Sequence, residues 1–265
     1  MRDLHFVVCM KVVPKPEEVR VDPETRRLDR AGARSEINPP DMNALELALG
    51  LKDQHGGRVS ILSMGPPFFE PYLRVGLAMG ADQIVLLSDA QFGGADTLAT
   101  TYTLACGIQK MGGADVILCG EESSDGATGQ VPPGLAEWLD LPQLTLVTDV
   151  ALDLEARCAR GRREIRGGYE LLEVAVPAVL SVKTSCNEPR FMDYRIKSWA
   201  FGEGRVTVWG REDLSAEESM IGVRGSPTTI SGLEEARVRE RRREFLRGTP
   251  EEIARDLVRR LSQAG

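Results

Sequence analysis

The chain has 265 residues, 42% hydrophobic and 28% charged, which is enough apolar material for one large α/β domain or for a domain with an appendage. Its formal net charge of −7 excludes a generally basic surface, so nucleic acid is not an expected partner. No apolar run is long enough to cross a bilayer, and the N-terminus lacks the hydrophobic region of a secretory signal. We therefore expect a cytoplasmic protein without membrane insertion.

The cysteines are scattered, and none stands two or three residues from another: Cys9, Cys106, Cys119, Cys158 and Cys186. This spacing gives no zinc knuckle, iron–sulfur ligand run or CxxC motif, so no metal is expected. An odd, scattered set suits small buried side chains in a reducing cytosol.

Five short apolar runs without strict alternation predict strands that are covered on both faces of a parallel sheet. They are residues 4–8, 59–62, 84–87, 116–119 and 144–147.

Helical segments lie between these runs. One starts at Asp41, the second covers residues 68–79 with Gly80 as its C-terminal stop, the third starts at Asp96, and the fourth covers residues 130–139. The alternation predicts an α/β fold with a doubly wound, mainly parallel sheet, Rossmann-like and similar to the adenine nucleotide alpha hydrolase group.

Two insertions interrupt this rhythm. Residues 19–21 and 27–29, joined by an Asp-Pro-Glu-Thr turn, predict a hairpin. Residues 152–176 contain strand-like pieces around Gly161 and the Gly167–Gly168 pair, which indicates an antiparallel meander.

After Lys183 the chain has few core-forming runs and cannot bury much surface alone. We expect a nucleotide-binding domain over residues 1–185 and an extended C-terminal arm over residues 186–265. The arm ends in two charged helices, about 233–246 and 250–261, the second with Thr249 as N-cap.

Ligands of an open parallel sheet bind beyond the carboxyl ends of its strands. In the loop after residues 116–119, Gly126 and Gly129 allow close approach of the backbone, and Thr128 and Gln130 stand where a helix begins with free amide donors. The pattern suits a phosphate, and it equally suits a glycine-rich turn whose Thr only caps the helix.

The loop after residues 84–87 leads to Asp96 and Thr97 at the start of a helix. An Asp there more often satisfies the helix amides than it binds a ligand. The chain has no Walker A motif and no GxGxxG after a strand.

Groups for acid–base catalysis are few. His5 lies in a predicted strand and His55 just past a helix, and no GxSxG, HExxH or paired-carboxylate arrangement is present. A nucleotide-binding protein without such groups fits an electron carrier, because electron tunnelling needs position rather than proton donors. We expect no catalytic residue in this chain.

Seven short segments follow one another in a recognisable order: residues 11–14, 37–46, 63–67, 77–82, 94–97 and 125–131, then Asn187, Glu188, Pro189, Arg190 and Phe191. Together they resemble the beta subunit of electron transfer flavoproteins over nearly the whole chain to about Ile230. The last segment is similar to the start of that family's partner-recognition loop.

The resemblance implies a heterodimer, in which an alpha subunit carries the electron-transferring FAD and is embraced by the C-terminal arm of this chain. The pair would pass electrons from a dehydrogenase, or from NADH, to an acceptor such as a quinone oxidoreductase. In simpler members the beta subunit binds a structural AMP. In FixA-like members the same pocket holds a second FAD, which accepts a hydride from NADH for electron bifurcation.

Carried over by position, the nucleotide would contact a set of residues on the loops that follow the strands: Cys9, Asn38, Pro39, Asp41, Met64, Gly65, Gly120, Glu121, Glu122, Ser123, Asp125, Thr128, Gly129, Gln130 and Val131. In FAD-type members Asp96, Thr97 and Thr100 would join them.

Residues 92–100, 208–214 and 221–228 resemble the FAD-type, FixA-like branch, so FAD is the expected cofactor and AMP the alternative. Ala90 stands where many members of that branch have Arg, and Glu121 and Glu122 stand where a basic residue and Gln are usual. An acid beside a phosphate is unfavourable unless it points away or contacts ribose hydroxyls.

Two alternatives belong to other classes. A nucleotide-binding regulator of the universal-stress type shares this kind of sheet, but it does not need the roughly 80 residues after Lys183. An ATP-pyrophosphatase-type enzyme would need an SGGxDS-like loop after the first strand, and residues 9–13 do not resemble one.

Overall fold

The computed structural model describes residues 3–15, 20–21, 28–29, 34–228 and 244–263. The chain forms two compact units, Met1–Gly232 and Leu233–Gly265. The first unit contains all the described strands and all the described helices except α7 (Pro250–Gln263).

The main sheet of the described residues has nine strands in the order β11-β10-β9-β12-β8-β1-β6-β7-β13. From β9 to β13 every neighbouring pair is parallel, whereas β9–β10 and β10–β11 are antiparallel. The strands are β1 (His5–Cys9), β6 (Arg58–Met64), β7 (Gln83–Leu87), β8 (Val116–Gly120), β9 (Gln143–Asp153), β10 (Cys158–Ile165), β11 (Gly168–Ala175), β12 (Ala178–Val182) and β13 (Val206–Trp209). The α/β fold with a mainly parallel, Rossmann-like sheet is therefore confirmed.

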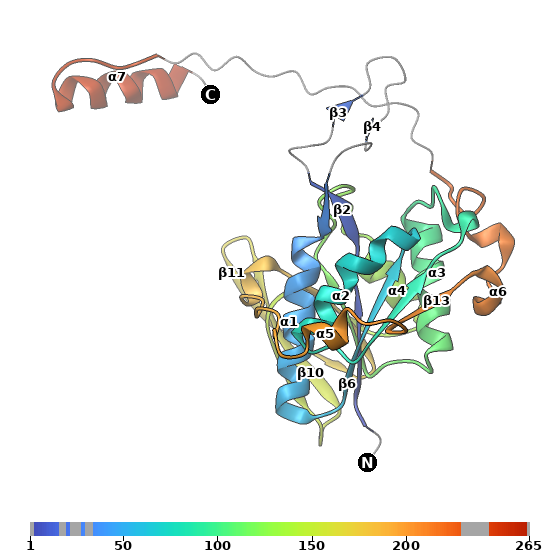
Figure 1. Cartoon of the computed structure of the whole chain (residues 1–265). Coiled ribbons are helices and arrows are strands. Elements are labelled where there is room, and N and C mark those ends of the chain that lie inside the picture. The colour runs from blue at the N-terminus through green and yellow to red at the C-terminus, as the bar shows by residue number, and fades with distance from the viewer. Residues whose placement is uncertain (1–2, 16–19, 22–27, 30–33, 229–243, 264–265) are drawn as a thin grey trace. The chain divides into compact units, whose positions relative to one another are not determined.

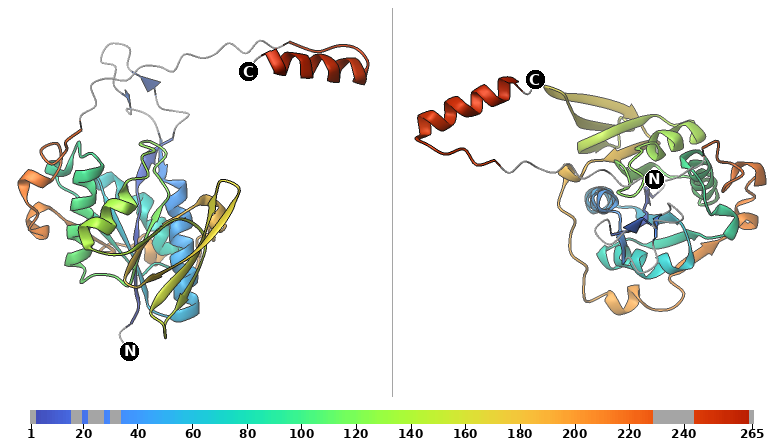
Figure 2. Two further views of the ribbon diagram at one scale, coloured as in Figure 1. Left: turned by 180° about the vertical axis from the view of Figure 1, so that it is seen from behind. Right: turned by 90° about the horizontal axis from the view of Figure 1, so that it is seen from above.

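The central strands β1, β8 and β12 are fully buried, and β6 and β7 are buried apart from their terminal residues. In β1, Phe6 and Val8 face one apolar cluster, with α1 (Pro39–His55) and α2 (Glu70–Met79), while Val7 and Cys9 face a second, with α3 (Thr97–Lys110) and α4 (Val131–Leu139). Figures 1 and 2 show α1 and α2 on one face of the sheet and α3 and α4 on the other. This two-sided burial explains why the apolar runs do not alternate with polar residues.

Local capping signals set the helix ends. Asp96 accepts the N–H groups of Leu98 and Ala99 and begins α3. Gly80 ends α2 with a φ of 123°, a value that a residue with a Cβ rarely adopts. In the second unit, the Thr249 Oγ1 accepts the Glu252 N–H and the Glu252 carboxylate accepts the Thr249 N–H, so the predicted N-cap of α7 is confirmed.

Two strands of the main sheet were not predicted. β12 is fully buried between β8 and β9. Its five residues almost directly follow the predicted meander in the sequence, so nothing in the sequence separated them from it. β13 pairs with β7 at the edge of the sheet; its four residues, Val-Thr-Val-Trp, favour a strand, but they lie in a segment with few other apolar runs. Both runs are short and apolar enough to form strands, and only their pairing with distant strands places them in the sheet.

The predicted insertions are present. β9, β10 and β11 form the antiparallel meander. The predicted hairpin corresponds to β3 (Arg20–Val21) and β4 (Leu28–Asp29), which pair antiparallel, and β2 (Val12–Pro14) pairs with β5 (Ser35–Ile37). Of the charged helix predicted at 233–246, residues 233–243 lie outside the described residues, and 244–246 are not helical.

Short elements complete the first unit. They are the 3-10 turns η2 (Pro67–Phe69), η3 (Ala90–Phe92), η4 (Thr184–Cys186) and η5 (Glu218–Met220), and the one-turn helices α5 (Lys197–Ala200) and α6 (Arg211–Leu214). Residues 186–228 thus pack on the sheet domain rather than extend from it.

Candidate functional site

A cleft of about 340 Å³ opens at the carboxyl ends of the parallel strands. Its walls come from the loops after β1, β6, β7 and β8 and from the beginnings of α1, α3 and α4. β1 is the strand at which the chain order of the sheet reverses, and a crevice at such a point is the usual ligand site of an open α/β sheet.

The Asp41 side chain lies buried at the floor of this cleft. Its carboxylate accepts the Lys11 N–H at 2.8 Å and the Gly120 N–H at 3.1 Å, and so joins the loops that follow β1 and β8. Burial raises the pKa of Asp41 to about 7, against the opposing effect of hydrogen bonds from the Lys11 amide, Asn38 and the Gly120 amide. The carboxylate therefore holds the cleft together and titrates near neutral pH.

Asn38 is equally buried and fixes the loop between β8 and α4. Its Nδ2 donates to the Glu122 carbonyl at 2.9 Å, and its Oδ1 accepts the Ser124 N–H at 3.0 Å. Because both ends of the amide are used, Asn38 positions the loop through its side chain.

Lys11 supplies the cation of the cleft. Its Nζ lies 2.6 Å from the Asp125 carboxylate and 3.5 Å from the Ser123 Oγ, so it bridges the loops after β1 and β8. Among the described residues that line the cleft, it is the sole Lys, Arg or His. The sequence prediction missed this role, although a lysine two residues past the end of a strand was a usable signal.

Cys9 and Cys119 stand side by side in register on β1 and β8, and both line the floor. The neighbouring Cys9 thiol and burial together hold the pKa of Cys119 well above its usual value. Cys119 therefore stays a neutral thiol, and both side chains pack in the apolar cluster under the cleft.

The start of α4 forms the end of the cleft that would suit a phosphate. Thr128, Gly129 and Val131 line it. Pro132 and Pro133 carry no N–H, so the free amide donors of this helix start are few and lie before Pro132.

The predicted cofactor residues are largely brought together. Those that line the cleft are Cys9, Asn38, Asp41, Met64, Gly65, Thr97, Thr100, Gly120, Glu122, Ser123, Thr128, Gly129 and Val131. Those that do not line it are Pro39, Asp96, Glu121, Asp125 and Gln130. Lining residues beyond the prediction are Met10, Lys11, Leu62, Pro66, Phe69, Phe92, Gly94, Ala95, Leu104, Cys119, Gly126 and Pro132.

The residues outside the lining have other partners. Glu121 faces Lys183, with 3.6 Å between the charged atoms, so this acid points away from the cleft. Gln130 accepts a hydrogen bond from the Thr97 hydroxyl at 2.8 Å and thereby links the starts of α3 and α4. Asp96 caps α3 and binds Thr228.

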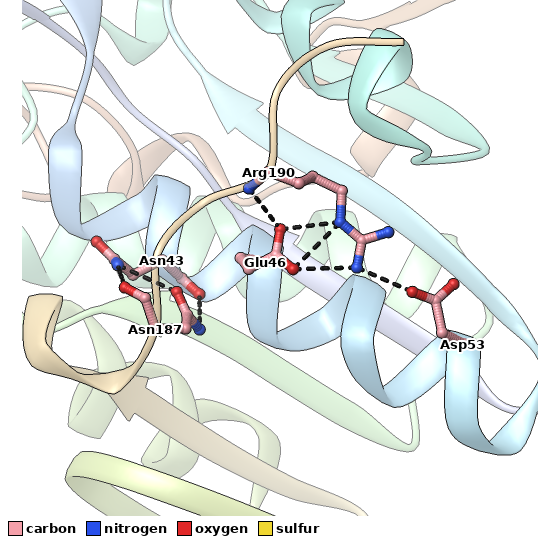
Figure 3. Close-up of polar contacts among 5 residues, drawn as sticks. All are labelled: Asn43, Glu46, Asp53, Asn187 and Arg190. Atoms are coloured by element: carbon pink, nitrogen blue, oxygen red, sulfur yellow. Dashed lines mark hydrogen bonds and ion pairs between the residues drawn. The ribbon is translucent and has the colours of Figure 1, made fainter.

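The predicted recognition segment lies against α1. Figure 3 shows Asn43 and Asn187 exchanging amide hydrogen bonds, of 2.7 Å to the Asn187 carbonyl and 3.1 Å to the Asn43 carbonyl. It also shows Arg190 binding both Glu46 and Asp53, each at 2.9 Å. Directly after this anchor, Phe191 is 97% exposed. The segment is thus a fixed loop that presents an uncovered aromatic ring.

A wider hollow, of about 590 Å³, lies over the outer face of β9–β11 and is lined by residues such as Arg162, Tyr169 and Leu171. It is an open sheet face on which no set of buried polar groups converges. The cleft at the strand ends is therefore the better candidate site.

In the described part of the chain, no group of three or more His, Cys, Asp or Glu side chains is placed to hold a metal ion. Nor does any helix in that part have the length and apolar character needed to cross a membrane.

The chain is similar to known proteins over most of its length, including the residues that form the cleft. The electron transfer flavoprotein domain model matches residues 25–209. The chain is 44% identical to the electron transfer flavoprotein subunit beta of Clostridium acetobutylicum, covering 86% of each chain. It is 42% identical to protein FixA of Azorhizobium caulinodans, over 86% of this chain and 83% of that one. It is 41% identical to the caffeyl-CoA reductase-Etf complex subunit CarD of Acetobacterium woodii, over 86% of both. The chain therefore belongs to the electron transfer flavoprotein family, as a beta subunit similar to FixA.

Proposed function

We propose that this chain binds FAD in the cleft at the strand ends and, paired with an alpha subunit, passes electrons between a dehydrogenase or NADH and an acceptor in the cytoplasm. The observation that carries the proposal is the cleft itself, where a buried Asp41, the Lys11 ammonium and the start of α4 converge in a member of this family. The regulator and pyrophosphatase alternatives have no support from the family match.

The lining supports a nucleotide. The adenine end would lie near Asn38 and Met64, and phosphates would lie near the amides before Pro132 and near Lys11. Glycine at position 120 lets the β8 backbone lie close to Asp41 at the floor of the cleft, since a Cβ there would lie 2.5 Å from the Asp41 carboxylate. When bound, FAD would supply the electron-accepting chemistry, and the residues of this chain would bind and orient it.

AMP is the second candidate ligand. The extension of the cleft along Phe92, Gly94, Ala95 and Thr100 favours the larger FAD, because AMP alone would leave that wall uncovered. Glu122 lines the cleft as an acid and would oppose a phosphate at its position, so it favours a ribose there.

The decisive experiment is coexpression with the alpha subunit, followed by counting flavins per heterodimer from the visible spectrum. Two flavins, with reduction by NADH, would support FAD in this cleft and a bifurcating role. One flavin with bound AMP would replace the FAD proposal by the structural AMP role. A heterodimer whose beta subunit holds neither nucleotide would refute the proposed function.

We further propose that the loop at Asn187, Glu188, Pro189, Arg190 and Phe191 receives the redox partner, and that the arm binds the alpha subunit. The anchoring of this loop on α1 supports a fixed docking element with Phe191 at its tip. Residues 186–228 belong to the same compact unit as the sheet, so the test removes only the remainder of the arm. Deletion of residues 229–265 should abolish copurification with the alpha subunit. A truncated chain that still copurifies would contradict the role of the arm.

A further inference from the structure

Residues 206–228, called the strap here, run along the β7 edge of the sheet and the α3 side of the domain. β13 extends the sheet next to β7, and Leu214, Ala216 and Ile221 are buried in the apolar cluster that contains α3. Tyr102 of α3 accepts the Glu217 N–H through its hydroxyl at 3.1 Å. The strap is therefore an integral part of the domain, through strand pairing and through side chains buried in its core.

Two aspartates attach the strap to the loop between β7 and α3, one at each end of that loop. At the first end, Asp89 Oδ1 accepts the Gln91 N–H at 2.9 Å, and Oδ2 accepts the Arg211 N–H of the strap at 3.0 Å. One carboxylate oxygen of Asp89 therefore binds the local turn, and the other binds the strap. Asp96 uses its two oxygens in the same way.

At the second end, Asp96 Oδ1 caps α3, and Oδ2 accepts the Thr228 hydroxyl at 2.7 Å and the Thr228 N–H at 3.1 Å. The Asp96 N–H also donates to the Ser226 Oγ at 2.8 Å. Burial alone would raise the pKa of Asp96, but hydrogen bonds from Thr228, Ala99 and Leu98 bring it below its usual value.

Between these two aspartates the strap touches the loop backbone. Gly222 has a φ of +53°, and a Cβ there would lie 2.0 Å from the Gln91 carbonyl oxygen. A Cβ on Gly94 would lie 2.6 Å from the Val223 side chain. Such close contact at two glycines leaves the loop little freedom to move apart from the strap.

The same loop forms one wall of the cleft, through Phe92, Gly94 and Ala95, and Thr97 continues that wall into α3. None of Asp89, Asp96 or Thr228 lines the cleft. The three residues therefore support the wall without contacting the interior of the cleft.

We propose that the strap, held by Asp89 and Asp96, is a positioning element of the cleft, so that occupancy of the cleft and docking of the strap stabilise each other. This inference rests on the proposed function, because it requires AMP or FAD in the cleft. Linkage makes the effect reciprocal: a nucleotide that needs the wall in place tightens the strap, and a loosened strap weakens the nucleotide.

The test uses Thr228→Val in the full chain, which removes the hydroxyl donor at an exposed position and keeps the shape of the side chain. The Kd for AMP and for FAD should rise about fivefold. Thr228→Ser restores the hydroxyl and should restore the wild-type Kd. Thr207→Val, an exposed threonine on β13 away from Asp96, is the matched control and should leave the Kd unchanged.

Hydrogen exchange supplies the reciprocal measurement. Saturation of the wild-type chain with the nucleotide that binds should slow exchange of residues 221–228, and the slowing should be smaller in Thr228→Val. A Kd for Thr228→Val equal to that of the wild type, or no slowing in the wild type, would overturn the strap proposal alone. A wild-type chain that binds neither AMP nor FAD would instead refute the proposed function, and this inference with it.

Discussion

Asp41 and Gly120 meet at the floor of the cleft, where the Asp41 Oδ1 accepts the Gly120 N–H at 3.1 Å. A Cβ on residue 120 would lie 2.5 Å from that oxygen and 2.7 Å from the Pro40 backbone carbon. The loop after β8 can therefore approach α1 this closely only with glycine at position 120. Four predictions follow from this cleft and from the loop on α1.

Gly120→Ala should destabilise the chain by about 1–3 kcal/mol, because the added methyl group collides with backbone that cannot move aside. The free energy of unfolding in urea measures the effect. Gly50→Ala is the matched control, since a Cβ at position 50 of α1 meets nothing within 4 Å. That control should stabilise the chain by about 0.5–1 kcal/mol. Equal stabilities for the wild type and Gly120→Ala would contradict the close approach.

Stability should depend on pH through Asp41, whose pKa burial raises to about 7 from its usual value of 3.8. Between these values the folded state binds the extra proton and the unfolded state does not, so stability falls as the pH rises through this window. One such proton contributes a slope of at most about 1.4 kcal/mol per pH unit.

The measurement is urea unfolding from pH 4 to pH 8 for the wild type and for Asp41→Asn. The variant should lose this component of the slope, and it should also lose stability because an amide cannot accept both the Lys11 and the Gly120 N–H groups. Identical pH profiles for the two proteins would show that Asp41 does not titrate in this window.

Lys11→Met should weaken nucleotide binding by about 0.5–1 kcal/mol, a two- to fivefold rise in Kd. The effect is modest because the ammonium is 44% exposed and already paired with Asp125. Titration calorimetry at two salt concentrations would measure it, and the salt dependence should be smaller in the variant. Lys15→Met, which removes a lysine paired with Glu36 outside the cleft lining, should leave the Kd unchanged.

Phe191→Ala should leave stability within about 0.5 kcal/mol of the wild type, because the ring is 97% exposed. Electron transfer from the partner dehydrogenase should nevertheless slow, through a raised KM for the flavoprotein. Tyr169→Ala, an exposed aromatic on the outer face of the meander, is the control and should leave that KM unchanged. A normal KM for Phe191→Ala would remove this ring from the docking surface.

The local parts of the fold were accessible to prediction. Gly80 and Asp96 were assigned to helix ends from residue type and position, and both have that role, because capping is settled within one turn of chain. Five of the parallel strands, β1, β6, β7, β8 and β9, were predicted from apolar runs, because a strand covered on both faces is locally apolar. The site followed in outline, because the carboxyl ends of parallel strands lie on one edge of the sheet wherever the loops go.

The amino-acid sequence by itself thus determined most of the elements, the two-sided sheet and the edge where a ligand would bind. Tertiary structure alone decided which distant groups contact one another. It placed β12 and β13 in the sheet, paired Lys11 with Asp125, and hydrogen-bonded Asp96 to Thr228. Asp96 has the same short-range pattern whether it contacts a ligand or the strap. The capping of α3 is the same in the two cases, and only Ser226 and Thr228, more than 100 positions away, distinguish them.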